Sequence, residues 1–126
     1  WKVYLHGNQY FLGRCYIWAK RENAVDFFDM IDEEAGEYMK VGNLLKKSLH
    51  GLFQPDLFNY ATLGNETPHL HTHLIPRYSS VRNFAEITFE DRRFGQNYAP
   101  YDKTFKVPEK ALLKIRDSIK EELENK

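Results

Sequence analysis

The feature that most constrains the fold is a long amphipathic segment that begins at Asp32 and ends at Pro55. Asp32 is a typical helix N-cap residue, and Glu33 and Glu34 suit the first turn, where acidic side chains favour the helix dipole. The apolar residues of the segment step by three or four positions and form one stripe: Tyr38, Val41, Leu45, Leu49 and Leu52. The sequence therefore predicts one long helix with a single apolar face.

Strand-like segments precede this helix. Residues 1–5 alternate in polarity, and residues 10–19 are rich in aromatic and β-branched side chains. Turn-forming residues at positions 6–9 separate the two segments, so we expect a β-hairpin. Gly13 marks a bulge or a close approach of the backbone.

More strands follow the helix. Residues 57–63 and 69–75 predict two strands joined by a tight loop over residues 64–68. A short strand is expected over residues 84–89, whereas residues 92–102 lack periodicity and predict an ordered loop. A last helix begins near Pro108, a favoured first helical residue, and its apolar face is formed by Leu112, Ile115, Ile119 and Leu123.

Composition excludes several classes of protein. The chain has 18 basic and 18 acidic residues and no long block of either sign, so we expect no duplex nucleic acid as a partner. No apolar run of about 18 residues could span a bilayer, so we expect a soluble protein without a membrane partner. The single cysteine, Cys15, allows no internal disulfide and is typical of a small buried side chain, which favours a cytoplasmic location.

Three of the five histidines stand at alternate positions: His69, His71 and His73. Alternate side chains of a strand share one face, about 7 Å apart, so three imidazoles are expected on one surface. A neutral imidazole can attack phosphorus, a second can hold the tautomer of the attacking ring, and a third can donate to the leaving oxygen. This division of roles is what phosphoryl or nucleotidyl transfer requires.

A metal site is the alternative interpretation of the same histidines, because two alternate histidines on a strand make a good zinc pair. The spacing disfavours it, since His69 and His73 lie about 13 Å apart on a flat strand. We therefore expect neither a metal nor a cofactor. A metal-dependent phosphohydrolase stays an alternative.

The motif of three alternate histidines followed by two apolar residues, here residues 69–75, resembles the signature of the histidine triad (HIT) family of nucleotide hydrolases and transferases. Gly64 and Asn65 are similar to the Gly-Gln or Gly-Asn pair before that triad, and residues 75–77 to the exit from its strand. The resemblance covers residues 1–80. It implies an α+β fold, a meandering antiparallel sheet with one long packed helix, completed here by the C-terminal loop and helix of residues 81–126 into one domain of residues 1–126.

The resemblance also implies roles for the residues of the motif. His71 would be the nucleophile that forms a covalent nucleotidyl-imidazole, and His69 would orient and polarise it. His73 would lie against the α-phosphate or the bridging oxygen, where a protonated imidazole can stabilise charge or protonate the leaving group. Asn65 would donate a hydrogen bond to the same oxygens.

Further binding residues follow from the same resemblance. Asn59 matches a family position near the ribose or phosphate, and His6 and Asn8 fall where the family contacts ribose and base. Arg77 is a candidate phosphate ligand or the partner of an acidic side chain.

The chain departs from the family pattern at two positions. Glu66 replaces the Ser or Thr that assists the leaving group in many members, and Arg14 follows Gly13 where a Pro-Gly-His turn is common. We therefore expect the approach to the phosphate to be built differently here.

The hypothesis that follows is a nucleotide phosphohydrolase or nucleotidyl transferase that cleaves at the α-phosphate of a nucleoside phosphate. Dinucleoside polyphosphates and nucleoside phosphoramidates are the expected substrates, and a homodimer is the expected assembly, because family members commonly pair. A nucleotide-binding or sensing protein with little turnover is the second alternative.

Overall fold

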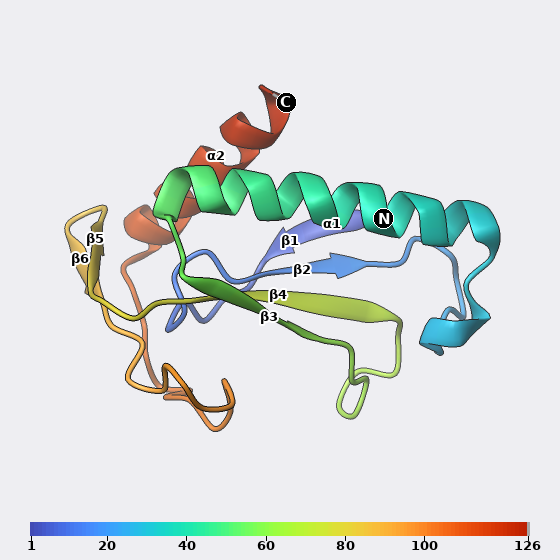
Figure 1. Cartoon of the computed structure of the whole chain (residues 1–126), viewed down its shortest axis with the longest axis horizontal. Helices are drawn as coiled ribbons and strands as arrows, with labels where there is room; N and C mark the ends of the chain where they lie inside the picture. Colours follow the sequence, from blue (N-terminus) through green and yellow to red (C-terminus); the bar gives the residue numbers. More distant parts are fainter. Residues whose placement is uncertain (126) are drawn as a thin grey trace.

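The long helix α1 (Asp32–Phe53) lies along one face of an antiparallel sheet in the computed structural model, which describes residues 1–125 (Figure 1). The predicted helix is confirmed, but its N-cap residue is Ile31, and Asp32 lies in the first turn with Glu33 and Glu34. The helix ends because Gln54, in the left-handed conformation, donates its backbone N–H to the His50 carbonyl.

The sheet has four strands in the order β1-β2-β4-β3: β1 (Lys2–Leu5), β2 (Cys15–Trp18), β4 (His71–Arg77) and β3 (Leu57–Ala61). All neighbours pair antiparallel, so the predicted α+β class is confirmed. Apart from the short turn η1 (Phe27–Asp29), the connections on both sides of α1 are loops.

The strand predicted over residues 10–19 is wrong at its start, because β2 begins only at Cys15. The Gln9 side chain closes the preceding loop, donating to the carbonyls of His6 and Arg14 and accepting the Gly13 N–H. The close approach expected at Gly13 is confirmed. Its φ is +86°, and a Cβ there would lie 3.0 Å from the Phe53 ring.

The strand predicted over residues 69–75 also begins later, at His71. Leu70 pairs with the segment after β2 instead, since its N–H donates to the Ala24 carbonyl and its own carbonyl accepts the Ala19 N–H. Residues 69 and 70 are therefore not part of the β3–β4 ladder. His69 therefore precedes the strand that carries His71 and His73.

The strand predicted over residues 84–89 is instead a hairpin of β5 (Arg82–Phe84) and β6 (Ile87–Phe89). Ala85 and Glu86 form its turn with positive φ angles, which neither residue type signals in a sequence. The last helix, α2 (Glu109–Glu124), is confirmed, with Pro108 as its N-cap residue rather than its first helical residue.

Alternate residues of β2 and β4 divide the protein into two sides. Cys15, Ile17 and Leu74 point toward α1 and α2 and belong to the main apolar core. Cys15 is buried as expected, and burial raises the pKa of its thiol to about 12. A smaller cluster covers the opposite face of the sheet, formed by Phe11, Ala61 and Ile75 with Tyr10, Tyr98 and Tyr101 packed against them.

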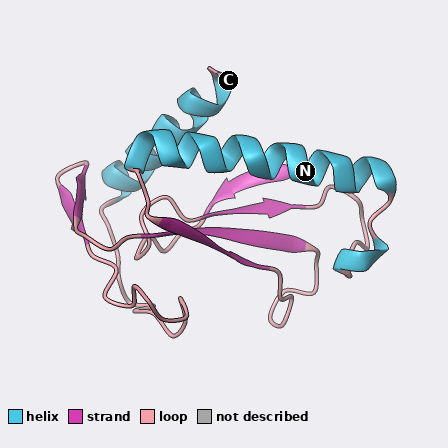
Figure 2. Cartoon of the chain, in the orientation of Figure 1, coloured by secondary structure: helices cyan, strands magenta, loops and turns pink. Residues whose placement is uncertain are grey.

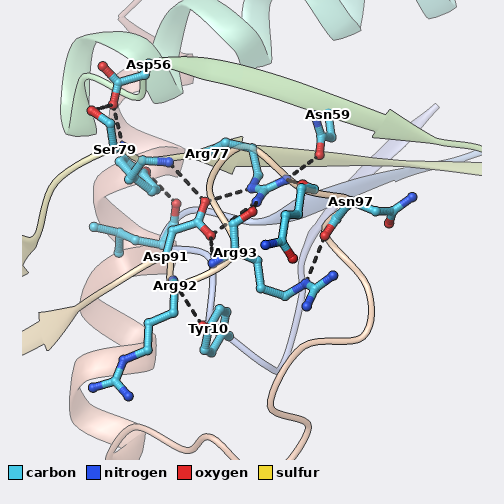
Figure 3. Close-up of polar contacts among 12 residues, drawn as sticks. Tyr10, Asp56, Asn59, Arg77, Ser79, Asp91, Arg92, Arg93 and Asn97 are labelled. Carbon is cyan, nitrogen blue, oxygen red and sulfur yellow. Dashed lines mark hydrogen bonds and ion pairs between the residues drawn. The ribbon is translucent and has the colours of Figure 1, made fainter.

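Arg77, at the end of β4, holds the segment after β6 against this opposite face (Figure 3). Its guanidinium forms a buried ion pair with Asp91, with 2.7 Å between Nε and Oδ2. The remaining N–H groups donate to Asn59 Oδ1 and to the carbonyls of Arg93 and Gln96. This buried arginine thus anchors the first part of the loop predicted over residues 92–102, and Arg93 binds the carbonyls of Asn97 and Ala99 further along it.

No helix within residues 1–125 is long and apolar enough to cross a membrane. The outer strands of the sheet are β1 and β3, and Leu57 and Tyr60 of β3 are exposed. Pairing of two chains stays a prediction.

Replacing Asp91 tests the role of the buried ion pair. Asp91→Asn leaves the Arg77 charge buried without a counter-charge, so we expect the free energy of unfolding to fall by about 3 to 5 kcal/mol. The neighbouring pair Glu90–Arg92 is exposed, and Glu90→Gln is the matched control, with an expected change within about 0.5 kcal/mol. Equal effects of the two variants in urea unfolding would contradict the anchoring role.

Candidate active site

A pocket of about 390 Å³ lies on the face of the sheet opposite α1. Its floor is formed by Tyr16 and Trp18 of β2 and by His71 and His73 of β4. Its walls come from the β3–β4 loop and from the segment that follows β6, both of which lie on this side of the sheet (Figure 2). The β3–β4 loop, which contains the predicted site residue Asn65, thus lines the same pocket as His71 and His73, two of the three predicted histidines.

The ring of His71 is held in one tautomer. Its Nδ1 lies 2.6 Å from the His69 carbonyl oxygen, and because a carbonyl can only accept, Nδ1 carries the proton. In the neutral ring, the lone pair is then on Nε2. This nitrogen is the one that can act as a nucleophile toward the pocket.

His69 acts on His71 through its backbone carbonyl. The His69 ring stacks on Trp18 with 4.1 Å between centroids, and its Nε2 donates to the Ala19 carbonyl over 2.7 Å. His69 precedes β4 and does not line the pocket itself, but its ring lies against Trp18, whose ring lines the pocket next to His71.

His73 lies next to His71, with 5.0 Å between ring centroids. Arg14 Nη2 lies 3.4 Å from His73 Nδ1, and since arginine only donates, the His73 proton sits on Nε2. Burial lowers the pKa of His73 to about 3, and the charges of Arg14, His71 and His6 act in the same direction. The free protein thus holds His73 neutral, in contrast to the protonated imidazole expected from the sequence.

Asn65 and Glu66 line the pocket from the β3–β4 loop, where Gly64 turns the chain with a φ of +80°. Asn65 is exposed, and its amide has no hydrogen bond to any residue of the described chain. Its donor groups are therefore available to a bound molecule.

Of the four predicted binding residues, the structure brings only His6 to the pocket, where its ring lies 5.6 Å from that of His73. Burial and the nearby charge of Arg14 lower the pKa of His6. Asn8 instead binds the carbonyls of Asp102 and Phe105. Arg77 forms its ion pair with Asp91 outside the pocket, and there it also donates a hydrogen bond to Asn59.

The sequence analysis missed Tyr16 and Trp18 as pocket residues, and it noted Arg14 only as a departure from the family pattern near the phosphate. Register explains the aromatic pair, since Tyr16 lies opposite His73 and Trp18 opposite His71. The three residues stand at alternate positions, the same period that revealed the histidines. For Arg14, the available signal was a lone arginine within the mostly apolar segment of residues 10–19.

A metal centre is not visible in the arrangement of side chains. Among residues 1–125, no three His, Cys, Asp or Glu side chains are grouped so that they could hold a metal ion.

The comparisons with known proteins agree with this geometry. A histidine triad protein from Bradyrhizobium japonicum has a TM-score of 0.79 and 17% identity over 97% of this chain and 83% of that chain. A histidine triad (HIT) protein from Sinorhizobium meliloti 1021 has a TM-score of 0.80 and 18% identity over 95% of this chain and 81% of that chain. These likenesses show the fold.

A curated relative, bis(5'-adenosyl)-triphosphatase from Saccharomyces cerevisiae, is 28% identical over 83 residues, which is 62% of this chain. The match spans only 40% of the length of that protein.

The model of one protein family, the HIT domain, matches residues 15–80, more than half of the chain. The matched residues include the three alternate histidines and the loop with Asn65. The chain belongs to the HIT domain family.

Proposed function

We propose that this protein cleaves nucleoside phosphates at the α-phosphate through a covalent nucleotidyl intermediate on His71. The observation that carries the proposal is the hydrogen bond from His71 Nδ1 to the His69 carbonyl. It leaves Nε2 as a free nucleophile in a pocket that also contains a donor on Asn65 and a neutral His73. The family membership supports nucleotide hydrolase or transferase chemistry.

In the first step, His71 Nε2 attacks the α-phosphorus and the bond from phosphorus to the leaving group breaks. The leaving group departs with the electron pair, and the neutral His73 can donate a hydrogen bond to it through Nε2–H, while any proton that the leaving group takes up comes from the solvent. His71 then carries a positive charge, which the His69 carbonyl stabilises through the Nδ1–H bond.

In the second step, a water molecule attacks the same phosphorus and the bond to Nε2 breaks. The electron pair returns to Nε2, and the proton that the water loses passes to the solvent, while His73 keeps its Nε2 proton. His71 and His73 are then in their starting protonation states.

The substrate class follows from the relatives and from the site. The yeast relative is named for the hydrolysis of bis(5'-adenosyl) triphosphate, so dinucleoside polyphosphates are the first candidates. Nucleoside phosphoramidates are the second, because attack on the α-phosphorus is the same whether oxygen or nitrogen leaves.

Loss of the nucleophile is the most direct test. His71→Ala should lower turnover by about a thousandfold or more and leave substrate binding within about tenfold. Quenching the wild-type enzyme with labelled nucleotide should trap an acid-labile, base-stable phosphoramidate on His71, and a chelator should leave turnover unchanged.

Four outcomes contradict this mechanism. A tenth of the activity remaining in His71→Ala, or label on another residue, would exclude His71 as the nucleophile. Activity lost in chelator would favour a metal-dependent phosphohydrolase, and tight nucleotide binding without turnover a sensing protein.

The side-chain amide of Asn65 provides a second test. Asn65→Ala should lower kcat by about 10-fold to 1,000-fold, as expected for the loss of one donor to the developing charge, with an unchanged melting temperature. Thr67→Ala, which removes another polar side chain of the same loop, is the matched comparison and should have a smaller effect. An unchanged rate in Asn65→Ala would restrict Asn65 to shaping the loop.

The depressed pKa of His73 predicts a pH dependence of stability. The folded-state pKa of about 3 lies below the unfolded value of about 6.5, so the unfolded chain binds this proton first. The contribution of neutral His73 to stability is complete above about pH 6.5 and is lost as the pH falls toward 3. His73→Gln should flatten this slope in urea unfolding, and a His73 ring that titrates near pH 6.5 by NMR would contradict the prediction.

A further inference from the structure

Arg14 is a buried cation whose hydrogen bonds are mostly unmade. The residue is only 4% exposed, and its Nε and Nη1 atoms have no hydrogen-bond partner among residues 1–125. Its one polar side-chain contact is the 3.4 Å approach of Nη2 to His73 Nδ1. Leaving charged donors buried and unpaired is costly, so the arrangement calls for an anion that is not part of the chain.

Arg77 shows what a purely structural buried arginine looks like in the same protein. All three of its nitrogen atoms donate, to the Asp91 carboxylate, to Asn59 and to two backbone carbonyls. Arg14 has no carboxylate in contact within the described chain. The two buried arginines therefore serve different purposes.

The position of the Arg14 guanidinium is fixed from two sides. The backbone of Arg14 donates to the Phe11 carbonyl and accepts the His6 N–H. The guanidinium carbon lies 5.0 Å from the ring centroid of Tyr101 and 5.4 Å from that of Tyr98. These aromatic rings hold the cation without satisfying its N–H groups.

Arg14 also has a defined place relative to the nucleophile. Trp18, Tyr16 and Arg14 stand at alternate positions, with Trp18 opposite His71 and Tyr16 opposite His73. Arg14 thus follows His73 on the side away from His71. Lys103 lines the same pocket from the segment after β6, which adds a second positive charge.

We propose that Arg14 binds the phosphate adjacent to the one that His71 attacks, so that the site favours substrates whose leaving group is itself a phosphate. Nucleoside polyphosphates and dinucleoside polyphosphates have such a group, whereas a nucleoside phosphoramidate with an uncharged amine does not. The planar guanidinium can bind two phosphate oxygens at once and stabilise the charge that develops as the phosphate leaves. This inference rests on the proposed function, but it concerns the leaving group and not the phosphate that His71 attacks.

The kinetic test compares two substrates in the chain of residues 1–126. Arg14→Gln should lower kcat/KM for diadenosine triphosphate by about 100-fold, as for the loss of one charged donor in the transition state. For adenosine 5'-phosphoramidate the loss should be smaller by about tenfold or more, because no leaving phosphate is present, whereas the effect of Arg14 on the neighbouring His73 is common to both substrates. Hydrolysis of the phosphoramidate also shows that the variant is folded.

Two further variants serve as controls. Lys106→Gln removes an exposed positive charge from the segment that follows β6, and it should leave kcat/KM for both substrates unchanged. Arg14→Lys keeps the charge but not the planar fork, and we expect it to recover part of the activity on diadenosine triphosphate. Equal losses on both substrates in Arg14→Gln would overturn the proposal.

A binding experiment separates this inference from the proposed function. Inorganic tripolyphosphate should bind the wild-type protein in calorimetry, and Arg14→Gln should weaken it by about tenfold or more. If wild type hydrolyses neither nucleotide but binds tripolyphosphate through Arg14, the proposed function fails and the phosphate site stands. If both nucleotides are hydrolysed through His71 and the affinity for tripolyphosphate is the same in wild type and Arg14→Gln, the phosphate site fails and the proposed function stands.

Discussion

The antiparallel pairing of β2 with β4 is the constraint on which the rest of the protein depends. It joins the segment before α1 to the segment after it, and its register sets Tyr16 against His73 and Trp18 against His71. Because alternate residues face opposite sides, the same strands supply Ile17 and Leu74 to the core under α1. One ladder therefore positions both the apolar core and the floor of the pocket.

Two buried arginines on the polar side of this sheet, Arg77 and Arg14, have different roles. Arg77 donates hydrogen bonds to Asp91 and to backbone carbonyls, and so holds the segment after β6 against the sheet. That segment then places Tyr98 and Tyr101 against Arg14, whose Nε and Nη1 atoms have no hydrogen-bond partner among residues 1–125. Residues of this segment and Arg14 lie outside residues 15–80, the range that matches the HIT domain model. The family match thus covers His71 and His73, and the residues outside it complete the pocket around them.

The sequence predicted the long helix, the antiparallel pairs and the alternating histidines, because each depends on a short-range period that side chains reveal. It misplaced the start of β4, since the pairing of Leu70 with Ala24 joins residues that are far apart in the chain. It also misjudged the hairpin at Ala85 and Glu86, whose positive φ angles run against the preferences of both residue types. Asn8, Asn59 and Arg77 were placed by resemblance, and their hydrogen bonds in the fold lead away from the pocket.

The sequence by itself determined the chemistry of the site: an imidazole at position 71 flanked by two others, after a loop with a free amide at Asn65. Only the tertiary structure decided how that chemistry is set up. The His69 carbonyl holds the His71 proton, and the neighbouring Arg14 charge keeps His73 neutral together with burial. Tautomers and pKa values depend on distances between groups and on desolvation, and these exist only once the chain has folded.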